Sequence, residues 1–339
     1  VDIRGKVDKK TGKTERSPLL DKQYSVVVFD EAQNLKNVES KQFKEAENIK
    51  ADYRVFATAT PMDKIQGATY FMATLHNIPL EKLMDDLGYT IVEKESKSGE
   101  IYYVAKLTEK ANSWEEVLDA LLRYRDKAIK EGKMIRREYP FYGDIEFKHL
   151  KLSDTQVEEQ RTIDRYWEEE ITRKPDKKYT LAGNRIQELS RWTETQKTKA
   201  VIQELEKDLA EGKSVIIVAE RINPTKIKGL ADTEIHSLLS YVATYLDSKG
   251  IPYAEIYGHG SKAGEVEKFQ SNKVRVALAT KDSGGVGINL DDITGKHPRV
   301  MYLASIDFSG NTFQQTIGRV SRRMTVTPAL VKVFAFDNS

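Results

Sequence analysis

Short blocks of apolar residues alternate with amphipathic segments along the last part of the chain. The apolar blocks fall at residues 214–219, 252–257, 274–279, 299–304 and 330–336. Segments with helical periodicity lie between them, among them residues 235–249 and 311–323. Short blocks without polar alternation are typical of parallel strands that are buried on both faces. The alternation of strand and helix therefore predicts a parallel sheet with helices on both faces.

A shorter version of this pattern is found near the start of the chain. Residues 25–29 form the apolar block Ser-Val-Val-Val-Phe, and a second block, 53–57, follows a helix-like segment. The two blocks predict two strands of another α/β lobe. Residues 63–86 are predicted to be helical, and residues 89–106 to form a hairpin that turns at Ser98-Gly99.

The middle of the chain is strongly charged and has helical periodicity, with breaks at Pro140, Gly143 and Pro175. Its last amphipathic helix closes at Gly212. Together the patterns predict an α/β fold with two parallel-sheet lobes and a helical insertion between them. The predicted domains are residues 1–113 (first lobe), 114–212 (charged helical linker or insertion) and 213–339 (second lobe).

Composition agrees with two lobes and excludes several classes of site. A chain of 339 residues is long enough for two domains of about 150 residues each. There is no cysteine, which excludes disulfides and thiolate zinc sites, and none of the five histidines lies in a metal-ligand pattern. No apolar run approaches the roughly 20 residues of a membrane span, and no leader precedes the first strand, so we expect an intracellular protein. The net charge is only +2, so binding of nucleic acid would need a local basic patch.

Two acidic residues, Asp30 and Glu31, follow the first apolar block. In open α/β sheets, ligands bind at the carboxyl ends of the strands. Phosphoryl transfer needs a carboxylate that holds a hard cation and a second group that orients the attacking water. Asp30 suits the first role and Glu31 the second, although an aspartate here could equally cap the following helix.

A second candidate is the segment Gln315-Thr316-Ile317-Gly318-Arg319-Val320-Ser321-Arg322. On a continuous helix Gln315, Arg319 and Arg322 would share one face, with Ile317 and Val320 opposite them. Arginine suits planar, charge-assisted contacts with phosphate, although surface arginines on an ordinary amphipathic helix would show the same pattern. Between the two candidates, residues 283–289 contain three glycines, which allow a close backbone approach to a ligand.

The order and strand-end placement of these segments resemble those of superfamily 2 helicases, which have two RecA-like lobes. The matching segments are Asp30 to Gln33 (motif II), Thr58 to Pro61 (motif III), Thr280 to Asn289 (motif V) and Gln315 to Arg322 (motif VI). Residues 30–37, 134–137 and 152–156 are similar to Swi/Snf-type translocases, whereas 289–292 and 295–299 look closer to Strawberry notch-type and phage or large-virus helicases. The resemblance covers about residues 24–87 and 130–337.

Departures from the Swi/Snf pattern favour the viral and Strawberry notch-like branch. Gln33 stands where Swi/Snf-type proteins usually have His, and Ala59 stands where they have Gly. Their His and Gly-Gln near the last arginine are absent from residues 320–325. Residues 11–14, Thr-Gly-Lys-Thr, imitate the end of a P-loop, but Val7 occupies the place of its first glycine and no apolar strand precedes it. We therefore expect the first lobe to be incomplete, with the P-loop upstream of residue 1.

The resemblance implies a role for each candidate residue. Asp30 would hold Mg²⁺ through water and Glu31 would activate the hydrolytic water, with Arg319, Arg322 and Gln315 at the γ-phosphate. The remaining assignments are nucleotide binding for Gly287 and Asn289, coupling for Gln33, Thr58 and Thr60, and contact with the nucleic-acid backbone for Thr280 and Ser283.

These roles predict a nucleic-acid translocase or helicase that uses ATP and Mg²⁺ at the interface of the lobes, with double-stranded DNA favoured over RNA. Without its P-loop the chain would be inactive alone. The expected location is the cytoplasm or nucleoid of a bacterium or a virus-infected cell. One alternative is a non-catalytic nucleic-acid-binding or scaffold module. Another is the motor subunit of a restriction or antiphage system, which a nuclease or methylase domain elsewhere in the parent protein would reveal.

Overall fold

The computed structural model forms two compact units, Val1–Glu138 and Tyr139–Ser339. It describes residues 18–30, 32–35, 40–58, 64–95, 101–136, 140–224, 226–230, 236–257, 262–281, 288–305 and 310–337. None of the helices in these ranges is long and apolar enough to cross a membrane.

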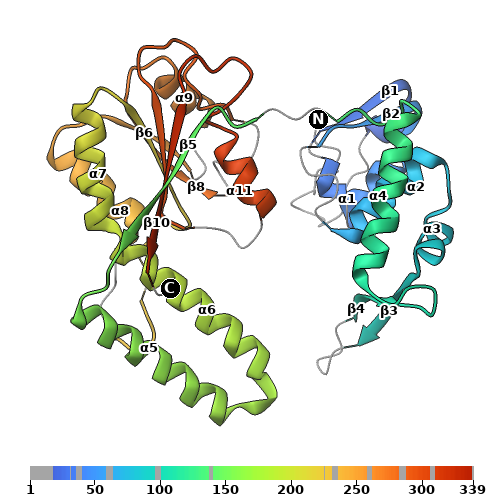
Figure 1. The fold of residues 1–339 in the computed structure, drawn as a ribbon, viewed down its shortest axis with the longest axis horizontal. Coiled ribbons are helices and arrows are strands. Elements are labelled where there is room, and N and C mark those ends of the chain that lie inside the picture. Colours follow the sequence, from blue (N-terminus) through green and yellow to red (C-terminus); the bar gives the residue numbers. More distant parts are fainter. Residues whose placement is uncertain are drawn as a thin grey trace. The chain divides into compact units, whose positions relative to one another are not determined.

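The second unit contains a sheet of six parallel strands (Figure 1). In sheet order they are β5 (Gly143–Leu150), β10 (Ala329–Phe336), β9 (Arg299–Leu303), β6 (Ser214–Ala219), β8 (Val276–Thr280) and β7 (Tyr253–Ile256). Five of the six match the apolar blocks predicted beyond residue 213. The predicted α/β class with a parallel sheet is therefore confirmed in this unit.

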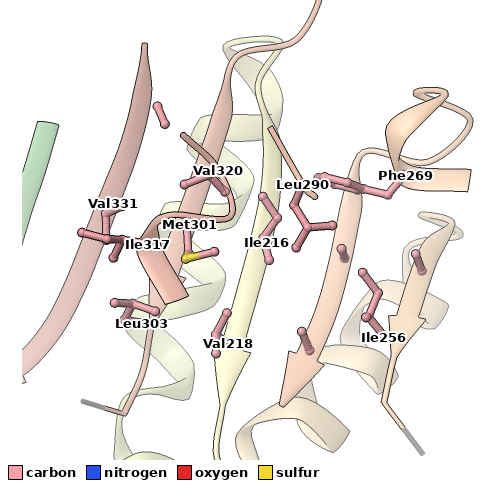
Figure 2. Packing of buried hydrophobic residues seen from close by; sticks show 14 of the residues in the cluster. Ile216, Val218, Ile256, Phe269, Leu290, Met301, Leu303, Ile317, Val320 and Val331 are labelled. Atoms are coloured by element: carbon pink, nitrogen blue, oxygen red, sulfur yellow. The ribbon is translucent and has the colours of Figure 1, made fainter. Parts of the chain in front are cut away.

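Alternate side chains of the inner strands fill two separate cores, as the two-residue period of a strand requires. On β6, Ile216 and Val218 lie in one core, while Val215 and Ile217 lie in the other. Figure 2 shows the first core, where Ile216 and Val218 lie among side chains of the neighbouring strands. Every residue of β6 is buried, because strands flank it on both sides and helices cover both faces.

Helices cover the two faces of this sheet. α7 (Thr198–Ala210) and α8 (Leu238–Ser248) pack on one core, and Phe269 of α9 (Lys262–Gln270) and Ile317 of α11 (Gly310–Ile317) pack on the other. Their apolar residues recur at helical spacing, as Val201 and Leu205 do on α7.

A helical hairpin of α5 (Asp154–Arg173) and α6 (Lys178–Gln196) projects from the sheet (Figure 1). The 3-10 helix η3 (Pro175–Lys177) joins the two helices. α5 begins with a capping box, in which Ser153 and Gln156 satisfy each other's backbone N–H groups. Trp167 and Trp192 are buried in the hairpin's own small core.

The edge strand β5 lies very close to β10 where it begins. A Cβ atom built on Gly143 would lie 1.9 Å from the carbonyl oxygen of Ala329, so only glycine fits at this position. The break predicted at Gly143 thus corresponds to the start of a strand.

The first unit contains two small sheets and four helices among its described residues. The parallel strands β1 (Gln23–Phe29) and β2 (Lys50–Phe56) form one sheet, and the antiparallel hairpin β3 (Tyr89–Glu95) and β4 (Ile101–Leu107) forms the other. The helices are α1 (Lys41–Glu47), α2 (Ile65–His76), α3 (Leu80–Leu87) and α4 (Trp114–Lys130), with 3-10 helices η1 (Pro18–Asp21) and η2 (Ala32–Leu35). The tip of the predicted hairpin, Ser98-Gly99, lies outside the described residues.

The segment 114–212 is divided between the units, in contrast to the separate helical insertion that the sequence predicts. α4 packs on α2 and α3 through Val117 and Leu121 in the core of the first unit. β5, α5, α6 and α7 belong to the second unit, whose boundary lies at Tyr139. The many charged residues of this segment made its apolar positions hard to recognise in the sequence. The apolar face of α4 packs in the core of the first unit, and that of α7 packs in a core of the second unit.

Candidate active site

The carboxyl ends of β1 and β2 bring Asp30 and Thr58 to the same edge of the small sheet. The strands pair in parallel as far as Phe29 opposite Phe56. Beyond that pair the backbones remain bonded, because Ala57 donates from its N–H to the Phe29 carbonyl (2.8 Å) and Ala32 donates to the Ala57 carbonyl (2.9 Å). Of the residues predicted from motifs II and III, Asp30 and Thr58 therefore lie at neighbouring strand ends. Asp30 is exposed and Thr58 half-buried.

Aromatic side chains anchor this edge. The rings of Phe29 and Phe56 stack with their centroids 5.3 Å apart. Phe56 also contacts Tyr70 and Phe71 of α2, at 6.1 and 5.5 Å between centroids. Such pairs add to the gain from apolar burial. The last residues of both strands are thus fixed to α2, which limits how far Asp30 and Thr58 can move apart.

One described carboxylate at this edge is compatible with the Mg²⁺ that the resemblance implies. Among the described residues, no group of three or more His, Asp or Glu side chains could hold a metal ion. Mg²⁺ commonly keeps several waters and takes one or two carboxylates together with phosphate oxygens. The exposed Asp30 carboxylate fits such a water-mediated ligand.

In the second unit the predicted helix over residues 311–323 is too long, because α11 ends at Ile317. Gly318 still donates to the carbonyl four residues back, but Arg319 and Val320 donate only three residues back. The helix therefore tightens into a turn at Gly318, a poor helix former. We call residues 318–325 the arginine turn.

The three polar residues expected on one face of that helix do not share one environment. Arg319 is only 4% exposed, and its Nη1 donates to the carbonyl of Ile288 (3.1 Å). Arg322 is exposed and Gln315 is half-buried. The prediction of an outward face was therefore wrong for Arg319. The apolar face was predicted correctly, since Ile317 and Val320 are buried beside Met301 (Figure 2).

The segment after the glycine-rich stretch is bonded to the arginine turn. Leu290 donates from its N–H to the Arg319 carbonyl (2.9 Å), in addition to the bond from Arg319 to Ile288. The described end of the segment predicted as motif V therefore lies beside the segment predicted as motif VI. Thr280 ends β8 and is buried, while Asn289 is exposed.

Several predicted residues lie outside the part of the chain that the structure describes. They are Glu31, Thr60, Ser283, Gly287 and the side chain of Gln33, with Ala59 and the P-loop-like residues 11–14. Their assignments stay predictions.

Two buried acids were not predicted as site residues: Asp291, which accepts from Thr325 of the arginine turn, and its neighbour Asp292. Asp292 accepts bonds from Thr294 N–H and hydroxyl, Gly295 N–H and the Thr327 hydroxyl, at 2.8–3.0 Å. Burial raises the pKa of Asp292, but these bonds outweigh burial and hold it below its ordinary value. The sequence signal was the Asp-Asp pair, whose partners Thr325 and Thr327, more than 30 residues away, were not evident from spacing.

The sequence also gave no sign of a buried Lys197 and Glu194 at the carboxyl ends of β6 and β9. Lys197 Nζ donates to the Ala304 carbonyl (2.7 Å), and burial lowers its pKa to about 8. Glu194 accepts from the Glu220 N–H (2.7 Å) and from the Ser305 hydroxyl, and burial raises its pKa. This pair fixes the loops that follow both strands to the junction of α6 and α7.

A relative in a large virus is similar to half of this chain. The two sequences are 29% identical over 175 residues, which cover 50% of this chain and 29% of the relative, a protein of Acanthamoeba polyphaga mimivirus named provisionally as an ATP-dependent RNA helicase. The predicted resemblance to superfamily 2 helicases is confirmed. This chain thus spans less than a third of that relative's length. No protein-family profile matches the chain.

Two solved structures are weakly similar to this chain. The C-terminal part of the Fun30 ATPase domain is 11% identical, with a TM-score of 0.44 over 59% of this chain and 86% of that one. The Sulfolobus solfataricus SWI2/SNF2 ATPase core in complex with dsDNA is 16% identical, with a TM-score of 0.39 over 94% and 65%. Similarity this weak does not bear on what the chain binds or does.

Proposed function

We propose that this chain is part of an ATP-dependent nucleic-acid motor. The observation that carries the proposal is the placement of Asp30 and Thr58 at the carboxyl ends of two strands that pair in register. Ligands of parallel sheets bind at this edge. The name of the viral relative supports both ATP use and a nucleic-acid substrate.

In this proposal the residues of both units act on one nucleotide. Asp30 holds Mg²⁺ through water, and Glu31 accepts the proton of the attacking water. Arg322 and Arg319 stabilise the negative charge that grows on the phosphate, with Gln315 beside them. When bound, ATP with Mg²⁺ supplies the phosphoryl group. Arg319 is bonded to Ile288 in the structure, so this role requires it to exchange that carbonyl for phosphate.

The remaining residues keep their predicted roles. Asn289 and Gly287 contact the nucleotide, and Thr280 and Ser283 contact the nucleic-acid backbone. Gln33, Thr58 and Thr60 transmit the nucleotide state to the nucleic acid. Double-stranded DNA is the favoured substrate because residues 30–37 resemble Swi/Snf-type translocases, whereas the viral relative's name refers to RNA.

The test uses the full-length protein and compares Glu31→Gln with Glu81→Gln, the same change on the exposed face of α3. Nucleic-acid-stimulated ATP hydrolysis should fall at least about 10²-fold in Glu31→Gln and stay unchanged in Glu81→Gln. Binding of ATP should persist in both, because the change removes the base and not the phosphate contacts. Stimulation is measured with double-stranded DNA and RNA in parallel.

Two results would contradict the proposal. If ATP hydrolysis survives in Glu31→Gln, Glu31 is not the catalytic base. A wild-type protein that binds nucleic acid but neither binds nor hydrolyses ATP would instead indicate the non-catalytic scaffold.

A further inference from the structure

The end of the arginine turn is closed by the side chain of Thr325. Arg322 donates from its N–H to Thr325 Oγ1 at 2.6 Å, and Thr325 donates from its N–H to the Arg322 carbonyl at 3.1 Å. These reciprocal bonds join the two ends of a four-residue turn. The backbone of Arg322 is therefore held at both of its polar groups.

The Thr325 hydroxyl is itself oriented by a buried acid. A hydroxyl has one proton to donate and two lone pairs that can accept. Thr325 Oγ1 accepts from Arg322 and lies 3.1 Å from Asp291 Oδ2, an acceptor. Its one proton must then point to Asp291. The hydroxyl thus has a fixed rotation, which a hydroxyl facing only water would not have.

Asp291 is held in place because the residues on both sides of it form backbone hydrogen bonds. It is 2% exposed, and Leu290 before it is bonded to the Arg319 carbonyl. Asp292 after it is fully buried, and its carbonyl accepts from the Val326 N–H at 2.7 Å. The acid that orients Thr325 therefore sits in backbone that is tied to the turn both before and after Arg322.

The guanidinium group of Arg322 is exposed, so packing alone does not fix where it reaches. The position that the guanidinium group can reach depends on where the Arg322 backbone is held. A misplacement of about 1 Å in a group that acts on a reacting centre can cost about 10²-fold in rate. A hydrogen-bond network that fixes the Arg322 backbone would preorganise the guanidinium group before the transition state forms.

We infer that Thr325, oriented by Asp291, is a positioning residue for Arg322, an inference that rests on the proposed function of that arginine. Thr325 touches neither nucleotide nor nucleic acid in this proposal. It acts through the backbone of Arg322, so its loss should affect the rate of turnover more than the binding of ATP.

The chain offers a matched control in Thr327. Its hydroxyl also donates to a buried acid, Asp292 Oδ2, at 2.8 Å, but it has no bond to Arg322 among the described contacts. Thr325→Val and Thr327→Val each remove one hydroxyl and keep nearly the same volume. Each leaves a buried carboxylate with one hydrogen bond fewer, and Thr325→Val also removes the acceptor of the Arg322 N–H, so Thr325→Val should cost more stability than Thr327→Val. Thr325→Ser keeps the hydroxyl and serves as the rescue.

The experiment measures kcat and KM for ATP hydrolysis in the full-length protein, together with the melting temperature of each variant. Thr325→Val should lower kcat about tenfold and leave KM within about twofold, as expected when an interaction made only in the transition state is weakened. Thr325→Ser should restore kcat to within about twofold, and Thr327→Val should keep it near wild type. If Thr325→Val does not fold, Thr325→Ala carries the same test without the extra methyl group.

The inference is overturned if Thr325→Val and Thr327→Val have the same kcat, or if the loss is confined to KM. It also fails if Thr325→Ser is as slow as Thr325→Val. These outcomes differ from failure of the proposed function, in which the wild type itself does not hydrolyse ATP or Arg322→Ala turns over at the wild-type rate.

Discussion

Two strands with nearly the same apolar sequence have opposite environments in this chain. β1 contains Ser-Val-Val-Val-Phe and β6 contains Ser-Val-Ile-Ile-Val-Ala. All of β6 is buried, whereas Val26 and Val28 of β1 are 53% and 62% exposed. β6 has strands β8 and β9 on its two sides, while the one strand paired with β1 in the described ranges is β2.

The comparison shows that an apolar run predicts a strand but does not by itself bury it. Burial depends on neighbours from distant parts of the chain, because a strand in a parallel sheet needs flanking strands and a helix on each face. The exposed face of β2 agrees, since Tyr53 and Val55 are also exposed there. The two strands therefore offer similar residue types in two states of burial.

The largest expected effect comes from comparing a buried ion pair in the second unit with an exposed ion pair in the first. Lys332 of β10 is buried and bonds to the fully buried Asp208 with an Nζ–Oδ2 distance of 2.6 Å. Lys110 and Asp85 of the first unit pair at 2.5 Å but are both exposed. Lys332→Ala should cost up to about 3–5 kcal/mol in the free energy of unfolding, because it removes the buried cation of the pair and leaves the half-buried Lys213 as the charged partner of Asp208. Lys110→Ala should cost less than about 1 kcal/mol.

Tryptophan fluorescence can report each unit separately during urea unfolding. Trp167 and Trp192 lie in the second unit and Trp114 in the first, and these are all three tryptophans of the chain. Trp114→Phe leaves signal from the second unit alone, and the double change at Trp167 and Trp192 leaves the first. Equal costs for Lys332→Ala and Lys110→Ala would show that burial does not separate the two pairs.

The next effect tests the strands themselves. Ile216→Ala in β6 should cost about 2–5 kcal/mol, the range for deleting a buried aliphatic side chain. Val28→Ala in β1 should change the free energy of unfolding by less than about 0.5 kcal/mol, as at an exposed site. The two values come from urea unfolding with the reporter of the matching unit. A cost at Val28 that approaches the cost at Ile216 would mean that β1 is covered in the protein in solution.

The smallest effect is a difference in acid sensitivity. In the second unit, burial raises the pKa of Asp208 and Asp292, but hydrogen bonds outweigh it and leave both pKa values below the ordinary 3.8. A carboxyl group with a lowered folded pKa stabilises the fold above its unfolded pKa, and this stability is lost as pH falls through the folded pKa. The second unit should therefore lose stability as pH drops below about 4.

Asp292→Asn should flatten this pH dependence because it removes a carboxyl group whose folded pKa is lowered. The exposed Asp85→Asn is the control and should leave the dependence of the second unit unchanged. Urea unfolding of the Trp114→Phe background between pH 3 and pH 6 gives both slopes. Identical slopes for Asp292→Asn and its parent would remove Asp292 as a source of the acid sensitivity.

The sequence predicted the strands of this fold well and its polar contacts poorly. Apolar runs such as 214–219 identify strands because the pattern is local. The end of α11 was missed because a helical wheel assumes a continuous helix, whereas Gly318 begins a turn. That turn takes Arg319 into the interior, to the carbonyl of Ile288.

The other polar contacts that the sequence did not predict join residues far apart in the chain. Asp291 and Thr325 are 34 residues apart, and Glu194 and Ser305 are 111 apart. No spacing rule connects such residues, because sheet topology decides which strand ends meet. The division of residues 114–212 between the two units was not predicted for a similar reason. The many charged residues of these helices do not show which core each helix packs on.

The central claim is that the arginine turn of the second unit serves ATP hydrolysis, and neighbouring exposed arginines test it directly. Arg322 is assigned to the phosphate and Arg323 is not, although both are exposed on the same turn. In the full-length protein with nucleic acid present, Arg322→Ala should lower the single-turnover rate of ATP hydrolysis about 10²–10³-fold, with ATP affinity little changed. Arg323→Ala should keep the wild-type rate. Equal rates for the two variants would contradict the account.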